Sequence, residues 1–339
     1  MKLLANVALA TSLVVGLAGC PNKSRGESIK LTNDGNKAYG AKQYETAIEK
    51  YLKATERFHD NHQAWYGLAG AYMQGKQDWA KAADAMQNAV QVAPEQAMYQ
   101  LWYGRALYEK AIFQAKEDLA RRENKKIEEV QPDLTVINFE KSMSALQEAI
   151  KLNPDLWRAH YYIGRIYRDT DKSKEAAAEL TKAISYGPTE AAPYIALSEL
   201  YLKWDYTEQA LTVAQQGTQI VPGANEVSEL WYDAGRALDD KRADDKAIEA
   251  YDKALESRPD NHKAKFQRGQ AYFRKGDFTK AKKDLEDFSK SGGQSVEFAK
   301  QQASKMLLDI AAKSAMSGAP GAAPTEKLSP EDMVKKGKK

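Results

Sequence analysis

The chain is poor in the residues that usually build reactive or metal sites. It has one cysteine and four histidines among 339 residues. A single cysteine excludes an intramolecular disulfide and a thiolate cluster, and histidines scattered along the chain argue against a multi-histidine metal site. Lys and Arg number 50 against 47 Asp and Glu, a formal net charge of +3, without the basic excess of nucleic-acid-binding proteins.

Motifs of catalysis are missing as well. There is no glycine-rich phosphate loop and no H-E-x-x-H sequence. We therefore predict a protein that is not an enzyme, has no cofactor and no catalytic or metal site, and does not bind nucleic acid. Hydrophobic residues make up 43% of the chain, which is enough to form a core and excludes wholesale disorder.

The N-terminus has the pattern of a secretory signal. A lysine at position 2 precedes the apolar run Leu3–Leu17, and the segment ends Leu17-Ala18-Gly19-Cys20. It resembles the signal peptides of bacterial lipoproteins, which implies that residues 1–19 are removed and that Cys20 becomes the acylated first residue. Residues 20–27 would then be the lipidated cysteine and a short linker. The alternative is a buried helix with an incidental cysteine.

The resemblance also implies a location. In enterobacterial lipoproteins an aspartate after the cysteine favours retention in the inner membrane, but here Pro21 and Asn22 follow. We expect a lipid anchor on Cys20 in the outer membrane, facing the periplasm. Several acyl chains give a stable anchor, whereas a single chain binds only marginally.

The rest of the chain repeats with a period of about 34 residues. One copy contains Gly164, Tyr167, Ala176, Leu180, Ala183 and Pro188, and the next contains Ser198, Tyr201, Ala210, Ala214, Gly217 and Pro222. Apolar residues three and four apart place one stripe on each of two helices, small residues allow close packing, and proline ends the second helix. A single copy cannot bury both stripes, so neighbouring copies must stack.

These spacings resemble the tetratricopeptide repeat (TPR) pattern. The resemblance implies an all-α solenoid, a right-handed superhelix of about seven helix-turn-helix repeats over residues 28–295. Residues 109–138 interrupt the third repeat, and we interpret them as two longer helices that project as a finger. We expect a capping helix at residues 296–316, and a disordered tail at the Gly-, Ala- and Pro-rich residues 317–339.

In TPR arrays the first helix of each repeat lines a concave groove. Positions four and three apart on that helix share one face, and here they carry aromatic residues in one row and arginines in the next. The predicted partner-binding residues are Tyr66, Arg105, Tyr161, Arg165, Arg168, Tyr232, Arg236 and Phe266. Tyrosine and arginine dominate binding hot spots. Alternatively, the tyrosines are packing residues and the arginines form a solvated face.

The family's carboxylate clamp of Lys and Asn does not transfer, because Asn36 is its only matching residue. The leading hypothesis is a membrane-anchored scaffold or adaptor that holds envelope proteins or peptides. Its layout resembles that of lipoproteins that assist assembly of a secretin, a pilus or an outer-membrane complex. The alternative is a peptidoglycan- or polysaccharide-associated envelope protein whose aromatic residues stack on sugars.

Overall fold

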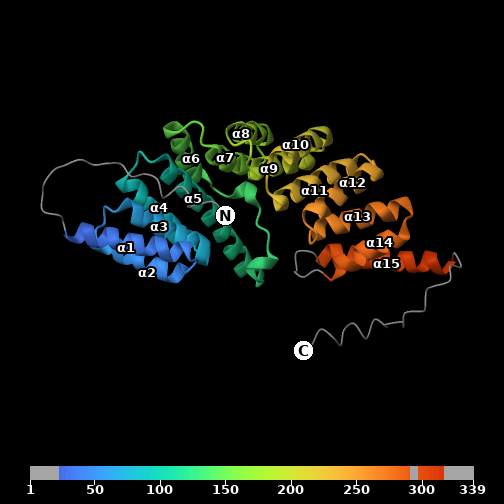
Figure 1. Cartoon of the computed structure of the whole chain (residues 1–339), viewed down its shortest axis with the longest axis horizontal. Coiled ribbons are helices and arrows are strands. Elements are labelled where there is room, and N and C mark those ends of the chain that lie inside the picture. Colours follow the sequence, from blue (N-terminus) through green and yellow to red (C-terminus); the bar gives the residue numbers. More distant parts are fainter. Residues whose placement is uncertain (1–22, 291–296, 317–339) are drawn as a thin grey trace, which may run out of the picture. The chain divides into compact units, whose positions relative to one another are not determined.

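A computed structural model describes residues 23–290 and 297–316 (Figure 1). Within these ranges the chain forms 15 α-helices and no strand, which confirms the all-α prediction. The first half contains α1 (Lys23–Gly40), α2 (Tyr44–Arg57), α3 (His62–Ala71), a π-helical turn (Tyr72–Lys76), α4 (Trp79–Val92), α5 (Ala97–Glu123), 3-10 turns at Ile127–Glu129 and Leu134–Val136, and α6 (Glu140–Leu152). The second half contains α7 (Trp157–Asp169), α8 (Ser173–Tyr186), α9 (Ala191–Lys203), α10 (Thr207–Ile220), α11 (Ala224–Asp240), α12 (Asp244–Ser257), α13 (His262–Lys275), α14 (Phe278–Ser289) and α15 (Glu297–Met316).

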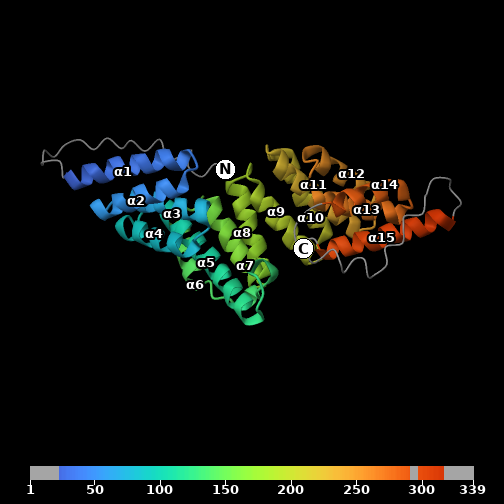
Figure 2. The same ribbon diagram turned by 90° about the horizontal axis from the view of Figure 1, so that it is seen from below.

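The chain divides into two compact units. The first consists of the described residues up to Gln114 together with Asn138–Leu152, and the second of Ala115–Ile137 together with the described residues from Asn153 onward. Within each unit, consecutive helices form antiparallel pairs that stack on the next pair, as both views of the ribbon show (Figures 1 and 2). In the second unit α15 packs against α14 and α13.

The core repeats along the chain as the sequence does. One alanine near the start of each second helix is fully buried in six repeats. These alanines are Ala47, Ala82, Ala176, Ala210, Ala247 and Ala281. In three repeats of the second unit the second helix buries a larger side chain four residues later, namely Leu180, Tyr251 and Leu285, and this side chain packs against a glycine of the first helix. Small residues at these positions therefore set how closely the two helices of a pair approach.

An asparagine joins consecutive repeats at two equivalent turns. Asn61 accepts a hydrogen bond from the backbone N–H of Ala64 at the start of α3, and its amide donates to the hydroxyl of Ser28 at 2.8 Å. Asn261 caps α13 in the same way and donates to Ser228 at 3.0 Å. Because one side chain satisfies both a helix end and a buried hydroxyl, it fixes the entry of the next repeat.

Several predicted boundaries shift. The first helix begins at Lys23, inside the segment expected to be linker, and the last begins at Glu297. The prediction that residues 109–138 form a finger of two longer helices is wrong. α5 continues to Glu123, but two 3-10 turns follow in place of a second long helix. The signal segment with Cys20 and the predicted tail at 317–339 lie outside the described residues.

Candidate partner-binding surface

In the first unit, Tyr66 and Arg105 belong to a group of aromatic side chains. The Tyr66 ring stacks on Tyr99, with ring centroids 5.1 Å apart, and the Tyr99 hydroxyl lies 2.7 Å from Nδ1 of His62. The Arg105 guanidinium lies 5.1 Å from the centroid of the Trp102 ring, within the range of a cation–π interaction. These contacts make Tyr66 and Arg105 parts of a packed aromatic cluster.

Tyr39 extends this cluster. Burial raises its pKa to about 12, the neighbouring Tyr44 and Tyr66 add to the rise, and Arg105 opposes it. The Tyr39 hydroxyl is therefore neutral at physiological pH.

In the second unit, two repeats each have a tyrosine paired with an arginine on the first helix. On α7 the Arg165 guanidinium lies 5.8 Å from the Tyr161 ring, and on α11 that of Arg236 lies 5.9 Å from the Tyr232 ring. In both pairs the arginine follows the tyrosine by one helical turn and so lies on the same face. Each pair combines an aromatic ring with a cation, and 39% of the Arg236 side chain is exposed.

Arg168 is engaged with neighbouring carboxylates. Its NH2 group lies 2.9 Å from Oδ1 of Asp169, and its NH1 group lies 3.9 Å from Oε2 of Glu199 on α9. A partner carboxylate at Arg168 would have to compete with both. The first-helix face of the second unit therefore has charges of both signs, and is not the row of arginines that the spacing predicted.

Phe266 is placed in the core. Its side chain is buried, and its ring centroid lies 4.7 Å from that of Phe288, within a cluster that also contains Ala281 and Leu285. A ring in this position offers no face to a partner. The binding prediction for the second unit depends on the Tyr–Arg pairs.

Asp233 is a polar residue on α11 that was not among the predicted site residues. It is 2% exposed, and its Oδ1 atom lies 3.9 Å from Arg236. Burial raises its pKa to about 8, with Glu199 and Glu229 adding to the rise and Arg236 and Lys263 opposing it. The acid is therefore mostly protonated at neutral pH. In the sequence, Asp233 stands out only because it is an acidic residue next to Tyr232, within an otherwise apolar stripe of the helix.

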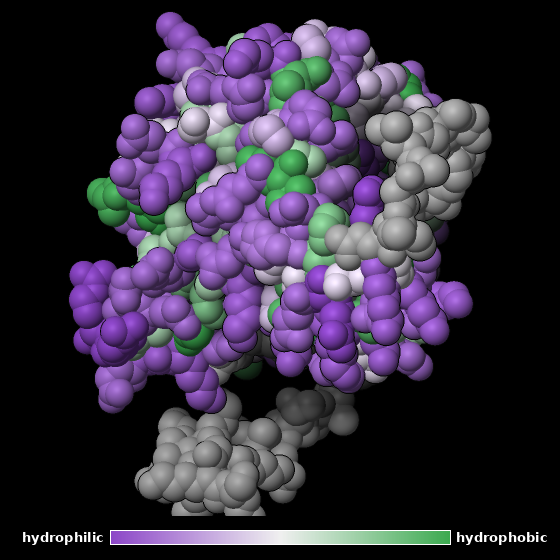
Figure 3. Space-filling view, turned by 90° about the vertical axis from the view of Figure 1, so that its left-hand side faces the viewer, coloured by the Kyte–Doolittle hydropathy of each residue, from purple (hydrophilic) through white to green (hydrophobic). Residues whose placement is uncertain are grey.

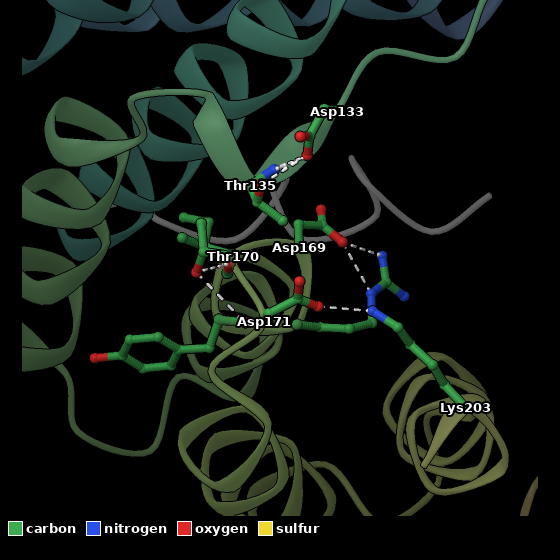
Figure 4. A network of polar contacts seen from close by, with 9 residues as sticks. Asp133, Thr135, Asp169, Thr170, Asp171 and Lys203 are labelled. Carbon is green, nitrogen blue, oxygen red and sulfur yellow. Dashed lines mark hydrogen bonds and ion pairs between the residues drawn. The ribbon is translucent and has the colours of Figure 1, made fainter.

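The insertion places a short polar segment beside the ends of α7 and α9. Residues 132–135 line a cavity of about 300 Å³ together with Arg168, Asp169, Asp171 and Lys203. Figure 4 shows Asp133 and Thr135 on one side, and Asp169, Asp171 and Lys203 on the other. Asp133 accepts hydrogen bonds from the backbone and hydroxyl of Thr135, and Lys203 donates to Asp171 at 2.8 Å. The cavity is thus polar, with its side chains paired locally.

The described residues contain no group of three His, Cys, Asp or Glu residues able to hold a metal ion. None of the helices in this part of the chain is long and apolar enough to cross a membrane. Figure 3 views the molecule from the side where α1 lies in Figure 1. Hydrophilic side chains cover most of that face, and hydrophobic ones form small separate groups.

The sequence profile of the tetratricopeptide repeat family matches residues 34–77, 74–123, 138–194 and 226–295, more than half of the chain. The chain belongs to the tetratricopeptide repeat family. TPR arrays stack their repeats into extended binding surfaces and generally mediate protein–protein interactions.

Two solved structures share the TPR fold. A tetratricopeptide repeat protein from Parabacteroides merdae is 10% identical, with a TM-score of 0.54 over 84% of this chain and 99% of that chain. The APC/C hetero-tetramer Cut9-Hcn1 is 12% identical, with a TM-score of 0.55 over 84% of this chain and 46% of that chain. At these identities the likeness concerns the fold alone.

One curated relative is longer than this TPR chain. Protein O-mannosyl-transferase TMTC1 of Homo sapiens is 28% identical over 145 residues, which are 42% of this chain and 16% of that protein. The chain thus spans about a sixth of this relative's length. The transferase activity in the relative's name describes that whole protein.

Proposed function

We propose that this protein is a lipid-anchored scaffold of the bacterial cell envelope. It holds partner proteins or peptides along the first-helix faces of its TPR units, and through them assists assembly of an envelope complex. Membership of the TPR family supports the binding role. The sequence Leu17-Ala18-Gly19-Cys20 supports the anchor and the location.

The observation that carries the binding role is the repeated Tyr–Arg pair of the second unit. Tyr161 with Arg165, and Tyr232 with Arg236, place a ring and a guanidinium at matching positions in two repeats. Packing between the helices of a pair does not require a cation at the position of Arg165 and Arg236, since Glu199 takes the equivalent position on α9. Two such pairs on one unit suit an extended peptide that presents carboxylates or backbone carbonyls at intervals.

The start of α1 limits how far the first TPR unit can lie from an acylated Cys20. Because α1 begins at Lys23, only Pro21 and Asn22 lie between it and Cys20, so the chain takes three residue-to-residue steps from Cys20 to the helix. An extended chain spans at most roughly 3.3–3.6 Å per residue, so the segment between Cys20 and α1 spans at most roughly 10 Å. An acylated Cys20 would hold the first TPR unit against the membrane surface, where it meets membrane-embedded or membrane-bound partners first.

Crosslinking in intact cells, followed by mass spectrometry, tests the binding role. The variant Arg165→Glu with Arg236→Glu should lose the partners that the wild-type chain captures. Arg57→Glu is the matched control, because Arg57 lies on a second helix and its side chain is 63% exposed. It should retain the partners. Circular dichroism must show the same helix content in all three proteins.

Two results would contradict the binding role. One is an unchanged list of partners in the double variant. The other is retention on purified peptidoglycan at high salt that depends on Tyr161 and Tyr232, which would favour the polysaccharide alternative.

A further inference from the structure

A second candidate surface lies where α8 begins and α9 ends, in the second unit. A pocket of about 220 Å³ opens there. Ala177 and Leu200 provide aliphatic lining, Tyr201, Trp204 and Tyr206 provide aromatic lining, and Lys174 is the one charged side chain among the lining residues. Trp204 is 41% exposed and Tyr206 57% exposed. The arginines on which the proposed function rests take no part in this pocket.

The turn between α9 and α10 does not require Trp204 or Tyr206. The same turn joins the two helices of all four repeats in the second unit, and in each a backbone hydrogen bond of 2.8–3.0 Å closes it across five residues. The central residue of each turn has positive φ. These residues are Asp171, Asp205, Arg242 and Gly276.

The neighbours of this central residue differ between repeats. Trp204 and Tyr206 flank it in the α9–α10 turn, whereas Lys241 and Ala243 flank it in the α11–α12 turn. Charged and small residues thus make the same turn without exposing two rings. Exposed aromatic side chains that the turn does not require are typical of a contact surface.

The lining indicates what kind of ligand fits. Its aliphatic and aromatic side chains suit one apolar side chain. The Lys174 ammonium makes no ion pair with any residue that the structure describes, whereas the nearby Lys203 is bound to Asp171 at 2.8 Å. A carboxylate beside the apolar group would therefore meet a cation that has no intramolecular partner to give up.

We propose that this aromatic pocket, formed by Ala177, Leu200, Tyr201, Trp204, Tyr206 and Lys174, docks an apolar side chain of a partner protein next to an Asp or Glu. It gives the scaffold a second contact, at helix ends and independent of the Tyr–Arg pairs. The inference rests on the proposed function only in that the ligand is a protein segment.

The test uses the full chain labelled with 5-fluorotryptophan and defined peptides. The chain has six tryptophans, and the ¹⁹F resonance of Trp204 is identified by its loss in a variant. The probe is the capped hexapeptide Gly-Ser-Leu-Glu-Gly-Ser. Its titration should shift the Trp204 resonance saturably, with binding about tenfold weaker when Ala replaces Leu and about two- to fivefold weaker when Lys replaces Glu.

The variant Trp204→Lys with Tyr206→Ala reproduces the α11–α12 turn, so it should fold normally and lose binding of a fluorescein-labelled copy of the peptide. The variant Lys174→Glu should weaken binding of the peptide that contains Leu-Glu and should not weaken binding of the peptide that contains Leu-Lys. The proposal is overturned if the Trp204 resonance does not move at millimolar peptide, if the Ala and Leu peptides bind equally, or if only chitin oligosaccharides shift it. The Arg165→Glu and Arg236→Glu variant should bind the peptide normally, which separates this test from that of the proposed function.

Discussion

Three repeats of the second unit carry a glycine at the same slot of the first helix, and we predict that replacing it by alanine has graded effects. An added Cβ would lie 2.6 Å from Cδ1 of Tyr251 at Gly235, 2.8 Å from Cγ of Leu180 at Gly164, and 3.1 Å from Cγ of Leu285 at Gly269. Non-bonded carbon atoms prefer about 3.5–4.0 Å. The overlap is therefore largest at Gly235.

The loss of stability on each Gly→Ala substitution depends on whether the side chain facing the glycine can move. Tyr251 is fully buried, and its hydroxyl donates a 2.7 Å hydrogen bond to Asp239, so its ring cannot turn aside without losing that bond. Overpacking costs about 1–3 kcal/mol or more, while alanine gains about 1 kcal/mol of helix propensity over glycine. We expect a loss of about 2 kcal/mol for Gly235→Ala and a change near zero for Gly269→Ala, with Gly164→Ala between them.

Thermal unfolding followed by circular dichroism measures the order, and hydrogen exchange in α11 and α12 locates the effect. A loss of about 2 kcal/mol corresponds to roughly 4–8 °C for a unit of this size. Tyr251→Leu provides a second test, because leucine fills this position opposite Gly164 and Gly269. It should make Gly235→Ala less costly in a double-mutant cycle. Equal costs at Gly235 and Gly269, or additive effects of Gly235→Ala and Tyr251→Leu, would refute the reasoning.

Three further predictions concern charge, capping and anchoring. Because the pKa of Asp233 is about 8 in the folded protein and near 3.9 when unfolded, the native state holds the extra proton and loses stability as pH rises from about 4 to 8. Asp233→Asn should flatten that decline and be about 1–3 kcal/mol more stable than wild type at pH 9; a parallel dependence of melting temperature on pH in both proteins would contradict this. Asn261→Ala should cost about 1–2 kcal/mol, since it removes the cap of α13 and a partner of Ser228, and an unchanged urea midpoint would count against that role. Cys20→Ser should move the protein from the membrane fraction to the soluble fraction, and an unchanged distribution would exclude a lipid anchor on this residue.

The sequence predicted the repeat phase well because a helix face is a local property. Residues three and four apart share a side of a helix whatever surrounds it. Ala176, Ala210, Ala247 and Ala281 could therefore be assigned to buried slots from spacing alone. The glycine slots followed from the same periodicity.

The site was only partly predictable. The spacing placed Tyr161 with Arg165 and Tyr232 with Arg236 on common faces, and the structure brings each pair together. Spacing placed Phe266 in the same row, but its ring packs on Phe288. Whether a residue on a given face is covered depends on the size and position of its neighbours in the next helix, which periodicity does not contain.

What the sequence by itself determined is the family of the chain, its helix pairs, and the small residues that let those pairs pack closely. What only the tertiary structure decided is the environment of individual side chains: the burial that keeps Asp233 protonated, the carboxylates that engage Arg168, and the exposed rings of Trp204 and Tyr206. The physical reason is that burial and electrostatic shifts sum over atoms from several repeats. Those atoms meet only when the helices stack.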